Sequence, residues 1–168
     1  MPPLRLLPRP GRLPRRAWLA ALLLLAPGRL AAAPEAEREA RQRAETEALL
    51  RRAAAYMDQV GTERALAAFN DPQGAFVEGE RYVFCNGIDG TVLAHGFNPA
   101  LLGRNLASLR DARGQPFAAA LIRLAVTQGE GWMRYEWLNP ATRRNEVKDT
   151  FVMRLREDIV CGTGHYGG

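Results

Sequence analysis

The apolar residues of the chain follow a helical period first and a strand period later. Residues 35–69 are rich in helix formers, and an apolar stripe recurs there every three or four positions. The stripe consists of Leu50, Ala53, Tyr56 with Met57, and Val60. Up to about Glu47 the same stretch is polar on nearly every side. The pattern predicts a long helix, interrupted at Gly61-Thr62, whose later half packs on a core.

Stretches rich in aromatic and β-branched residues follow and predict strands. After a turn at 70–76, strands are predicted at 81–87 and 91–96, joined by the turn Asp89-Gly90. Residues 112–128 are predicted to form a loop and then a helix, with Pro116 near the first turn of the helix. Three more strands are predicted at 131–139, 146–155 and 158–166. In the first of these, Trp132, Arg134 and Glu136 alternate with Met133, Tyr135 and Trp137.

The order of these elements defines a fold class. It runs long helix, strand pair, helix, three-strand meander, and a helix packed on an antiparallel sheet is an α+β architecture. The 135 residues from 34 to 168 are enough to bury a real core. We therefore predict one α+β domain over residues 34–168.

The first 33 residues have a different composition from the rest. Residues 1–16 hold five arginines and no acid, an apolar run follows at 17–26, and three alanines stand at 31–33. A basic region, a short apolar run and small residues make up a secretory signal peptide. The run is too short to span a bilayer, which takes about 20 residues. We predict a signal peptide at 1–33 and a periplasmic or secreted protein; an uncleaved interfacial anchor is the alternative.

Without the predicted signal peptide, the net charge of the chain is no longer basic. The full chain carries +5, and residues 1–33 contain six arginines and no Asp or Glu, so the remainder carries −1. A basic chain is typical of nucleic-acid binding. A domain with a net charge near zero gives no such indication, and we predict no nucleic-acid partner.

Two cysteines, Cys85 and Cys161, lie in the predicted domain. In an exported protein an even number of cysteines favours a disulfide. Such a bond would close a long loop and stabilise the fold by about 4 kcal/mol. The alternative is two buried free thiols that pack as small apolar residues.

Motifs of common enzyme classes give no indication of catalysis. The sequence lacks G-x-S-x-G, H-E-x-x-H, C-x-x-C and P-loop patterns. The histidines are His95 and His165, and a Cys/His metal site is disfavoured. Cys161 and His165 stand four residues apart on one predicted strand, about 13 Å at strand rise. We predict no catalytic activity, no metal and no cofactor.

Cations and aromatic side chains indicate instead a site for a small organic anion. A pocket with aromatic walls and one or two fixed cations suits a carboxylate. The candidate cations and donors are His95, Arg104, Arg134 and Lys148, and the candidate walls are Tyr56, Tyr82, Trp132, Tyr135 and Trp137. Taken singly, each has a structural alternative. Tyr56 fits the helix core, Trp137 a sheet edge, and Arg134 and Lys148 a solvated strand face.

The order of motifs over about residues 40–166 resembles the single Cache domains. Three stretches carry the resemblance. The first half of these domains is similar to AFNDPQGAFVEGERYVFCNGIDGTVLAHGFNPALLGRNL, and their DG-x-PF helix start to DARGQPFAAALIRLA. Their G-x-GW-x-x-Y-x-W-x-NP hairpin, with the Lys strand after it, is similar to GEGWMRYEWLNPATRRNEVKDTFV.

The resemblance implies a PAS-like extracellular sensor fold. A long N-terminal helix packs on a central antiparallel sheet, and a small-molecule pocket lies between the sheet and the loops that cover it. The first and last strands of such sheets are neighbours, which would place Cys85 and Cys161 on adjacent strands and favours the disulfide. The ligand-binding residues that it implies are Tyr82, Phe84, His95, Arg104, Trp132, Tyr135, Trp137 and Lys148.

The chain departs from the family pattern at three positions. It has AHG where AHP is usual, Phe151 where Tyr is common, and Asp149 where Ser or Thr usually follows the Lys. Asp149 either neutralises the charge of Lys148 that would hold a carboxylate, or points to the opposite face of the strand, as adjacent strand residues do.

These observations predict a non-catalytic extracytoplasmic single Cache domain that binds a small organic acid. We expect it to act with a signalling or transport partner, such as a membrane receptor or kinase. Two alternatives stay open. One is a ligand-free interaction module that pairs, with itself as a homodimer or with a partner, through the helix at 35–60. The other is a redox protein that uses Cys85 and Cys161.

Overall fold

The computed structural model describes residues 28–167. The predicted signal peptide at 1–33 lies outside these residues except for 28–33, which form the beginning of the first helix. Within the described range, none of the helices is long and apolar enough to cross a membrane.

Three α-helices and one short 3-10 helix make up the helical part. They are α1 (Gly28–Val60), α2 (Thr62–Phe69), η1 (Pro99–Leu101) and α3 (Phe117–Gln128). Gly61 separates α1 from α2 with a φ of 86°, a left-handed conformation that glycine adopts without strain. The predicted break in the long helix is therefore confirmed.

Five strands form one antiparallel sheet with the order β4-β3-β7-β6-β5. They are β3 (Phe84–Gly87), β4 (Val92–His95), β5 (Glu130–Leu138), β6 (Asn145–Arg154) and β7 (Ile159–Tyr166). A separate ribbon pairs β1 (Val77–Glu78) with β2 (Arg81–Tyr82). The strand predicted at 81–87 is thus divided at Val83, and β1 was not predicted. The predicted α+β class and the pairing of the first and last sheet strands are confirmed.

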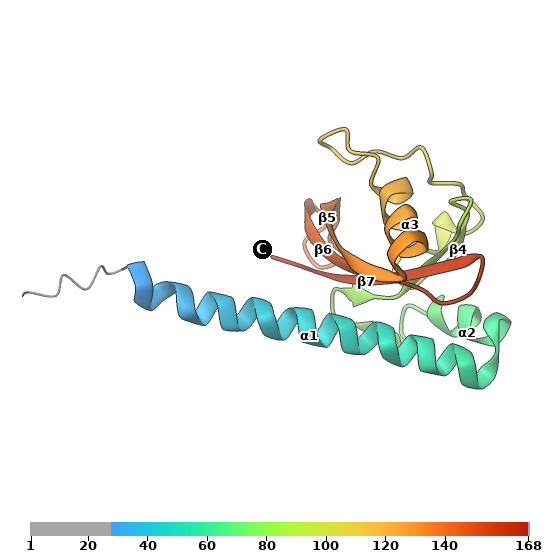
Figure 1. The fold of residues 1–168 in the computed structure, drawn as a ribbon, viewed down its shortest axis with the longest axis horizontal. Helices are drawn as coiled ribbons and strands as arrows, with labels where there is room; N and C mark the ends of the chain where they lie inside the picture. The colour runs from blue at the N-terminus through green and yellow to red at the C-terminus, as the bar shows by residue number, and fades with distance from the viewer. Residues whose placement is uncertain (1–27, 168) are drawn as a thin grey trace, which may run out of the picture.

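The sheet is covered by helices on both faces. Figure 1 shows α1 and α2 along one face and α3 on the other, with α1 continuing beyond the edge of the sheet. One apolar cluster joins Leu50 and Met57 of α1 to Phe151 of β6. A second joins Phe117 and Leu121 of α3 to Tyr135 of β5. Because successive strand residues point to opposite faces, β3, β5, β6 and β7 contribute to both clusters.

Cys85 and Cys161 stand opposite each other in the β3–β7 ladder and form a disulfide, with an S–S distance of 1.99 Å. Both residues are fully buried on the face towards α1. A buried disulfide is inaccessible to thiol reagents, which favours a structural role over a redox role.

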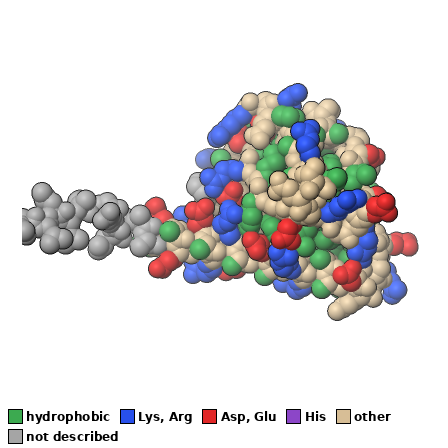
Figure 2. All heavy atoms as spheres, viewed as in Figure 1, with side chains coloured by type: hydrophobic (Ala, Val, Ile, Leu, Met, Phe, Trp, Pro, Cys, Tyr) green, Lys and Arg blue, Asp and Glu red, His purple; other side chains and the backbone are tan. Residues whose placement is uncertain are grey.

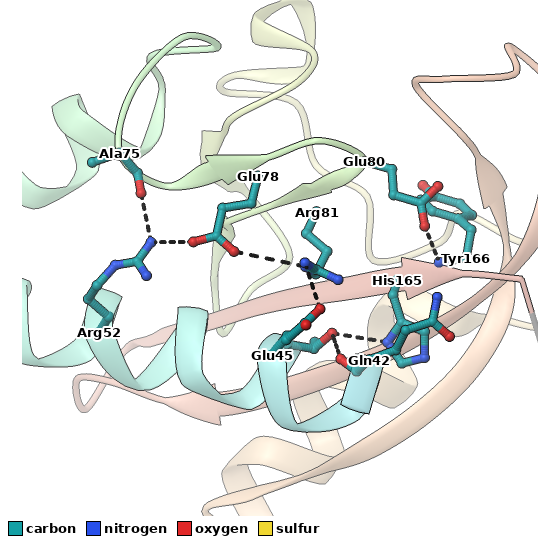
Figure 3. A network of polar contacts seen from close by, with 10 residues as sticks. Gln42, Glu45, Arg52, Ala75, Glu78, Glu80, Arg81, His165 and Tyr166 are labelled. Carbon is teal, nitrogen blue, oxygen red and sulfur yellow. Dashed lines mark hydrogen bonds and ion pairs between the residues drawn. The ribbon is translucent and has the colours of Figure 1, made fainter. Parts of the chain in front are cut away.

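The middle of α1 contacts β7 and the β1–β2 ribbon through polar side chains. Thr46 Oγ1 lies 3.0 Å from His165 Nδ1 on β7, and Arg81 of β2 pairs with Glu45 at 3.0 Å. Figure 3 shows the contact between Glu45 and Arg81 as part of a network around the β1–β2 ribbon. On the projecting end of α1, Figure 2 shows acidic and basic side chains interspersed.

Candidate functional site

A small cavity of about 30 Å³ lies between the sheet and α3. This volume holds about two water molecules. The sheet side of the lining includes Tyr82, Phe84, His95, Tyr135 and Trp137, and the α3 side includes Phe117, Ala118 and Leu121. The walls are therefore mostly aromatic and aliphatic, with a few polar groups among them.

Strand alternation places the aromatic residues of β5 on this face. Met133, Tyr135 and Trp137 contribute to the α3-side cluster. The ring of Phe117 stacks on Tyr135 with centroids 4.5 Å apart and an interplanar angle of 9°. This pair fixes the beginning of α3 against β5 and forms one wall of the cavity.

Lys148 of β6 is fully buried next to this cavity. Its Nζ lies 3.9 Å from the ring centroid of Tyr82, 5.2 Å from that of Tyr166 and 5.6 Å from that of Phe84. The amine has no hydrogen-bond partner among the described residues. Burial lowers the pKa of Lys148 to about 7, and the Glu80 carboxylate opposes this fall.

The side chain of Lys148 has room because β7 carries glycine beneath it. A Cβ at Gly164 would lie 2.8 Å from Lys148 Cε and 2.5 Å from the Asp149 carbonyl oxygen. A methyl group at position 164 is therefore incompatible with the observed backbone and with the Lys148 conformation.

We expect Gly164→Ala to reduce the free energy of unfolding by about 1–3 kcal/mol, because overpacking forces backbone and side chains apart. Urea denaturation measures this change. Thr163→Val is the control on the same strand, since the buried Thr163 hydroxyl has no hydrogen-bond partner among residues 28–167. Equal stability of Gly164→Ala and the unaltered protein would contradict the crowding seen here.

His95, at the end of β4, is a neutral hydrogen-bond donor. Its Nδ1 accepts from the backbone N–H groups of Asn98 at 2.9 Å and Phe97 at 3.3 Å. Burial, together with the charge of Lys148, lowers the pKa of His95 to about 3. With Nδ1 used as an acceptor, the neutral imidazole carries its proton on Nε2.

Two more polar atoms on this face lack hydrogen-bond partners among the described residues: the Tyr82 hydroxyl and Thr150 Oγ1. Burial raises the pKa of Tyr82 to about 12, so its hydroxyl stays protonated at neutral pH. Thr150 follows Lys148 by two positions on β6 and therefore shares its face. Lys148 and Thr150 of β6, and Tyr82 beside Lys148, thus each have a buried polar atom without a hydrogen-bond partner among the described residues, which is rare in native interiors.

The structure brings together six of the eight predicted site residues. Five of them line the cavity and Lys148 lies directly beside it. Trp132 lies on the opposite face, where its Nε1 donates to Glu47 of α1 at 3.0 Å. Arg104 is exposed in the loop after η1. Both residues therefore lie outside the cavity lining.

Asp149 also lies on the α1 face, where it pairs with Arg134. Asp149 therefore points to the opposite face of the strand from Lys148, which was the second of the two predicted alternatives. It does not neutralise Lys148 by direct contact. The prediction missed Thr150, Phe117 and Leu121. The two-residue period of β6 identifies Thr150, and the helical period after Pro116 identifies Phe117 and Leu121 as members of one face.

No group of three or more His, Cys, Asp or Glu side chains suited to a metal ion occurs within residues 28–167. The Lys148 amine, the Tyr82 hydroxyl and the Nε2–H of His95 are hydrogen-bond donors at or beside the cavity. They can hold an anion or the oxygen atoms of a polar ligand.

Comparison with known proteins agrees with this geometry. Residues 37–167 match the model of the family Single Cache domain 2. A methyl-accepting chemotaxis protein from Vibrio parahaemolyticus has a similar structure, with a TM-score of 0.69 and 23% identity over 82% of this chain and 96% of that chain. The periplasmic sensor domain of a chemotaxis protein is similar with a TM-score of 0.62 and 26% identity, over 79% of this chain and 97% of that one.

A third similar structure is a Cache chemosensory domain described for its carboxylic acid recognition. Its TM-score is 0.58, with 17% identity over 84% of this chain and 99% of that chain. At this identity the likeness concerns the fold. A search among curated proteins found no match.

Proposed function

Because this chain belongs to the Single Cache domain 2 family, whose members are non-catalytic ligand-binding sensor modules, we propose that it binds a small organic acid beside Lys148. The chain is an extracytoplasmic sensor domain like those of chemoreceptors. The finer proposal concerns the ligand and the residues that hold it.

The unpartnered Lys148 amine is the observation that carries the proposal. A buried cation without a counter-charge is costly, and a carboxylate supplies both the charge and the acceptors. The Tyr82 hydroxyl and the Nε2–H of His95 add two neutral donors near it. One structural relative is described for carboxylic acid recognition, which supports the same ligand class for this chain.

The cavity volume limits the size of the ligand. The cavity of about 30 Å³ is far smaller than an ordinary ligand pocket, so we propose the smallest acids, such as acetate, as its ligands. The apolar wall formed by Phe117, Ala118 and Leu121 suits a short alkyl group rather than a second charge.

The proposed function also requires export of the domain and a partner that responds to the bound ligand. We propose that residues 1–33 direct export to the periplasm or the exterior, and that a membrane receptor or kinase reads the bound state. The homodimer through α1 stays a prediction, which light scattering over a range of protein concentrations tests.

A thermal-shift screen with matched acid and amide pairs tests the proposed ligand class. Acetate, propionate and butyrate are compared with acetamide, propionamide and butyramide at equal concentrations. We expect the acids alone to raise Tm, because a ligand at a hundred times its Kd adds about 2.7 kcal/mol, which is several degrees for a domain of this size.

Variants locate the site. We expect Lys148→Met to abolish the shift, and Arg104→Met to retain it because Arg104 is exposed and outside the cavity lining. A folded protein that no acid stabilises, or that amides stabilise equally, would disprove the proposed ligand class.

A further inference from the structure

Within the part of the chain that the structure describes, no carboxylate forms a hydrogen bond with the Lys148 amine. Glu80, at the turn of the β1–β2 ribbon, is the acid that acts on its charge. The Glu80 oxygens are already engaged: Oε1 accepts from the Tyr166 backbone N–H at 3.1 Å, and Oε2 accepts from Asn139 Nδ2 at 3.2 Å. Figure 3 shows Glu80 directed at Tyr166. The ammonium form of Lys148 is therefore left without an acceptor.

The other titratable groups around Lys148 are neutral at pH 7. They come from each neighbouring strand: Tyr82 of β2, His95 of β4, Tyr135 of β5 and Tyr166 of β7. Burial raises the pKa of all three tyrosines and lowers that of His95. On the α3 side, Phe117 and Leu121 add no charge. Among residues 28–167, an ammonium here is stabilised by aromatic ring faces and by the engaged Glu80.

We propose that the pocket takes up one proton on Lys148 with each anion it binds, so that the domain responds to anion concentration and acidity together. The inference rests on the proposed function. The step forms no covalent bond: the neutral amine, a proton from solvent and a carboxylate become an ammonium carboxylate ion pair.

The physical reason is the difference between the empty and the occupied pocket. In the empty pocket, desolvation favours the neutral amine, whose pKa lies at about 7. A carboxylate beside Nζ raises this pKa, because an opposite charge within a few ångströms favours the charged form. Between the two pKa values, binding requires a proton from solution. Above about pH 7 the affinity then falls roughly tenfold for each pH unit.

Calorimetry on the disulfide-bonded protein tests this proposal, with acetate and propionate as probes. Titrations are performed at pH 8 in phosphate and in Tris, two buffers with different ionisation enthalpies. The difference between the two binding enthalpies, divided by the difference between the ionisation enthalpies, gives the number of protons exchanged. We expect uptake of nearly one proton at pH 8 and much less at pH 6. We also expect an affinity that is on the order of 100-fold weaker at pH 9 than at pH 7.

Two variants identify the proton acceptor. Arginine stays charged at every pH of the experiment, so Lys148→Arg is expected to bind without proton uptake and with an affinity independent of pH from 6 to 9. His95→Gln is expected to bind more weakly but to keep the uptake, because His95 is not the group that is protonated. Should Lys148→Arg not fold, an NMR titration of Lys148 in the unaltered protein gives the pKa directly, with and without acetate.

The outcomes separate this inference from the proposed function. Binding of either acid with no proton exchange, or a Lys148 pKa unchanged by acetate, overturns the inference and leaves the proposed function intact. Absence of binding by every acid between pH 5 and 9 overturns the proposed function and this inference with it.

Discussion

Lys148→Met is expected to stabilise the empty protein by about 3 kcal/mol at pH 7. A fall in pKa from 10.5 to about 7 corresponds to roughly 4–5 kcal/mol of cost for burying the charge. The contact with the Tyr82 ring at 3.9 Å is worth up to about 2 kcal/mol and is lost in the variant. Methionine fills a similar volume and carries no charge, so the balance favours the variant.

The pH dependence distinguishes this explanation from simple repacking. A lysine whose pKa is lowered on folding binds fewer protons in the folded state than in the unfolded state between pH 7 and 10.5. The free energy of unfolding of the unaltered protein therefore rises over this window. The advantage of Lys148→Met should be fully present below pH 7 and should disappear towards pH 10.5.

Urea denaturation of Lys148→Met and of the unaltered protein at pH 7 and at pH 9.5 gives the difference in unfolding free energy at each pH. Arg104→Met, an exposed cation, is the matched control and should change stability by less than about 0.5 kcal/mol at either pH. A destabilised Lys148→Met variant would mean that the buried amine makes favourable contacts that outweigh its desolvation.

Loss of the disulfide is expected to have the largest opposite effect. Cys85 and Cys161 are 76 residues apart in the sequence, and a bond that closes a loop of this length stabilises by about 4 kcal/mol in the chain-entropy model. The Cys85→Ala/Cys161→Ala double variant should lose about this much in urea denaturation. Its native structure should remain, since β3 and β7 stay hydrogen-bonded.

Reduction supplies an independent comparison. Dithiothreitol added during unfolding should lower the stability of the unaltered protein to that of the double variant, and should leave the double variant unchanged. A loss below 1 kcal/mol would indicate that the unfolded chain is already compact between these two strands.

Much of the fold could be predicted because its elements have distinct periods. The meander strands and α3 were predicted to within a few residues at most ends. The small β1–β2 ribbon was missed because two-residue strands carry no detectable period. Helices on both faces of the sheet were not predicted either, since the packing of α3 depends on contacts such as Phe117 with Tyr135 that are distant in sequence.

The site could be predicted in part, and its main error has a simple cause. Trp132, Tyr135 and Trp137 were all assigned to one pocket, yet the alternation of β5 places Trp132 on the other face. The same rule places Asp149 away from Lys148 and brings Thr150 onto its face. Arg104 was assigned from its loop position, and a loop has no period that fixes the direction of a side chain.

The disulfide and the cavity together have a consequence for the rate of binding. Phe84 lies on β3, which the disulfide joins to β7, and His95 lies on β4, which pairs with β3, so the sheet side of the cavity is firmly held. An anion must nevertheless reach an amine that the solvent does not touch. Since the sheet side is held in this way, we expect α3 and the loop before it to move when an anion enters, so that association would be limited by this motion rather than by diffusion. The observed rate should therefore level off as the anion concentration rises.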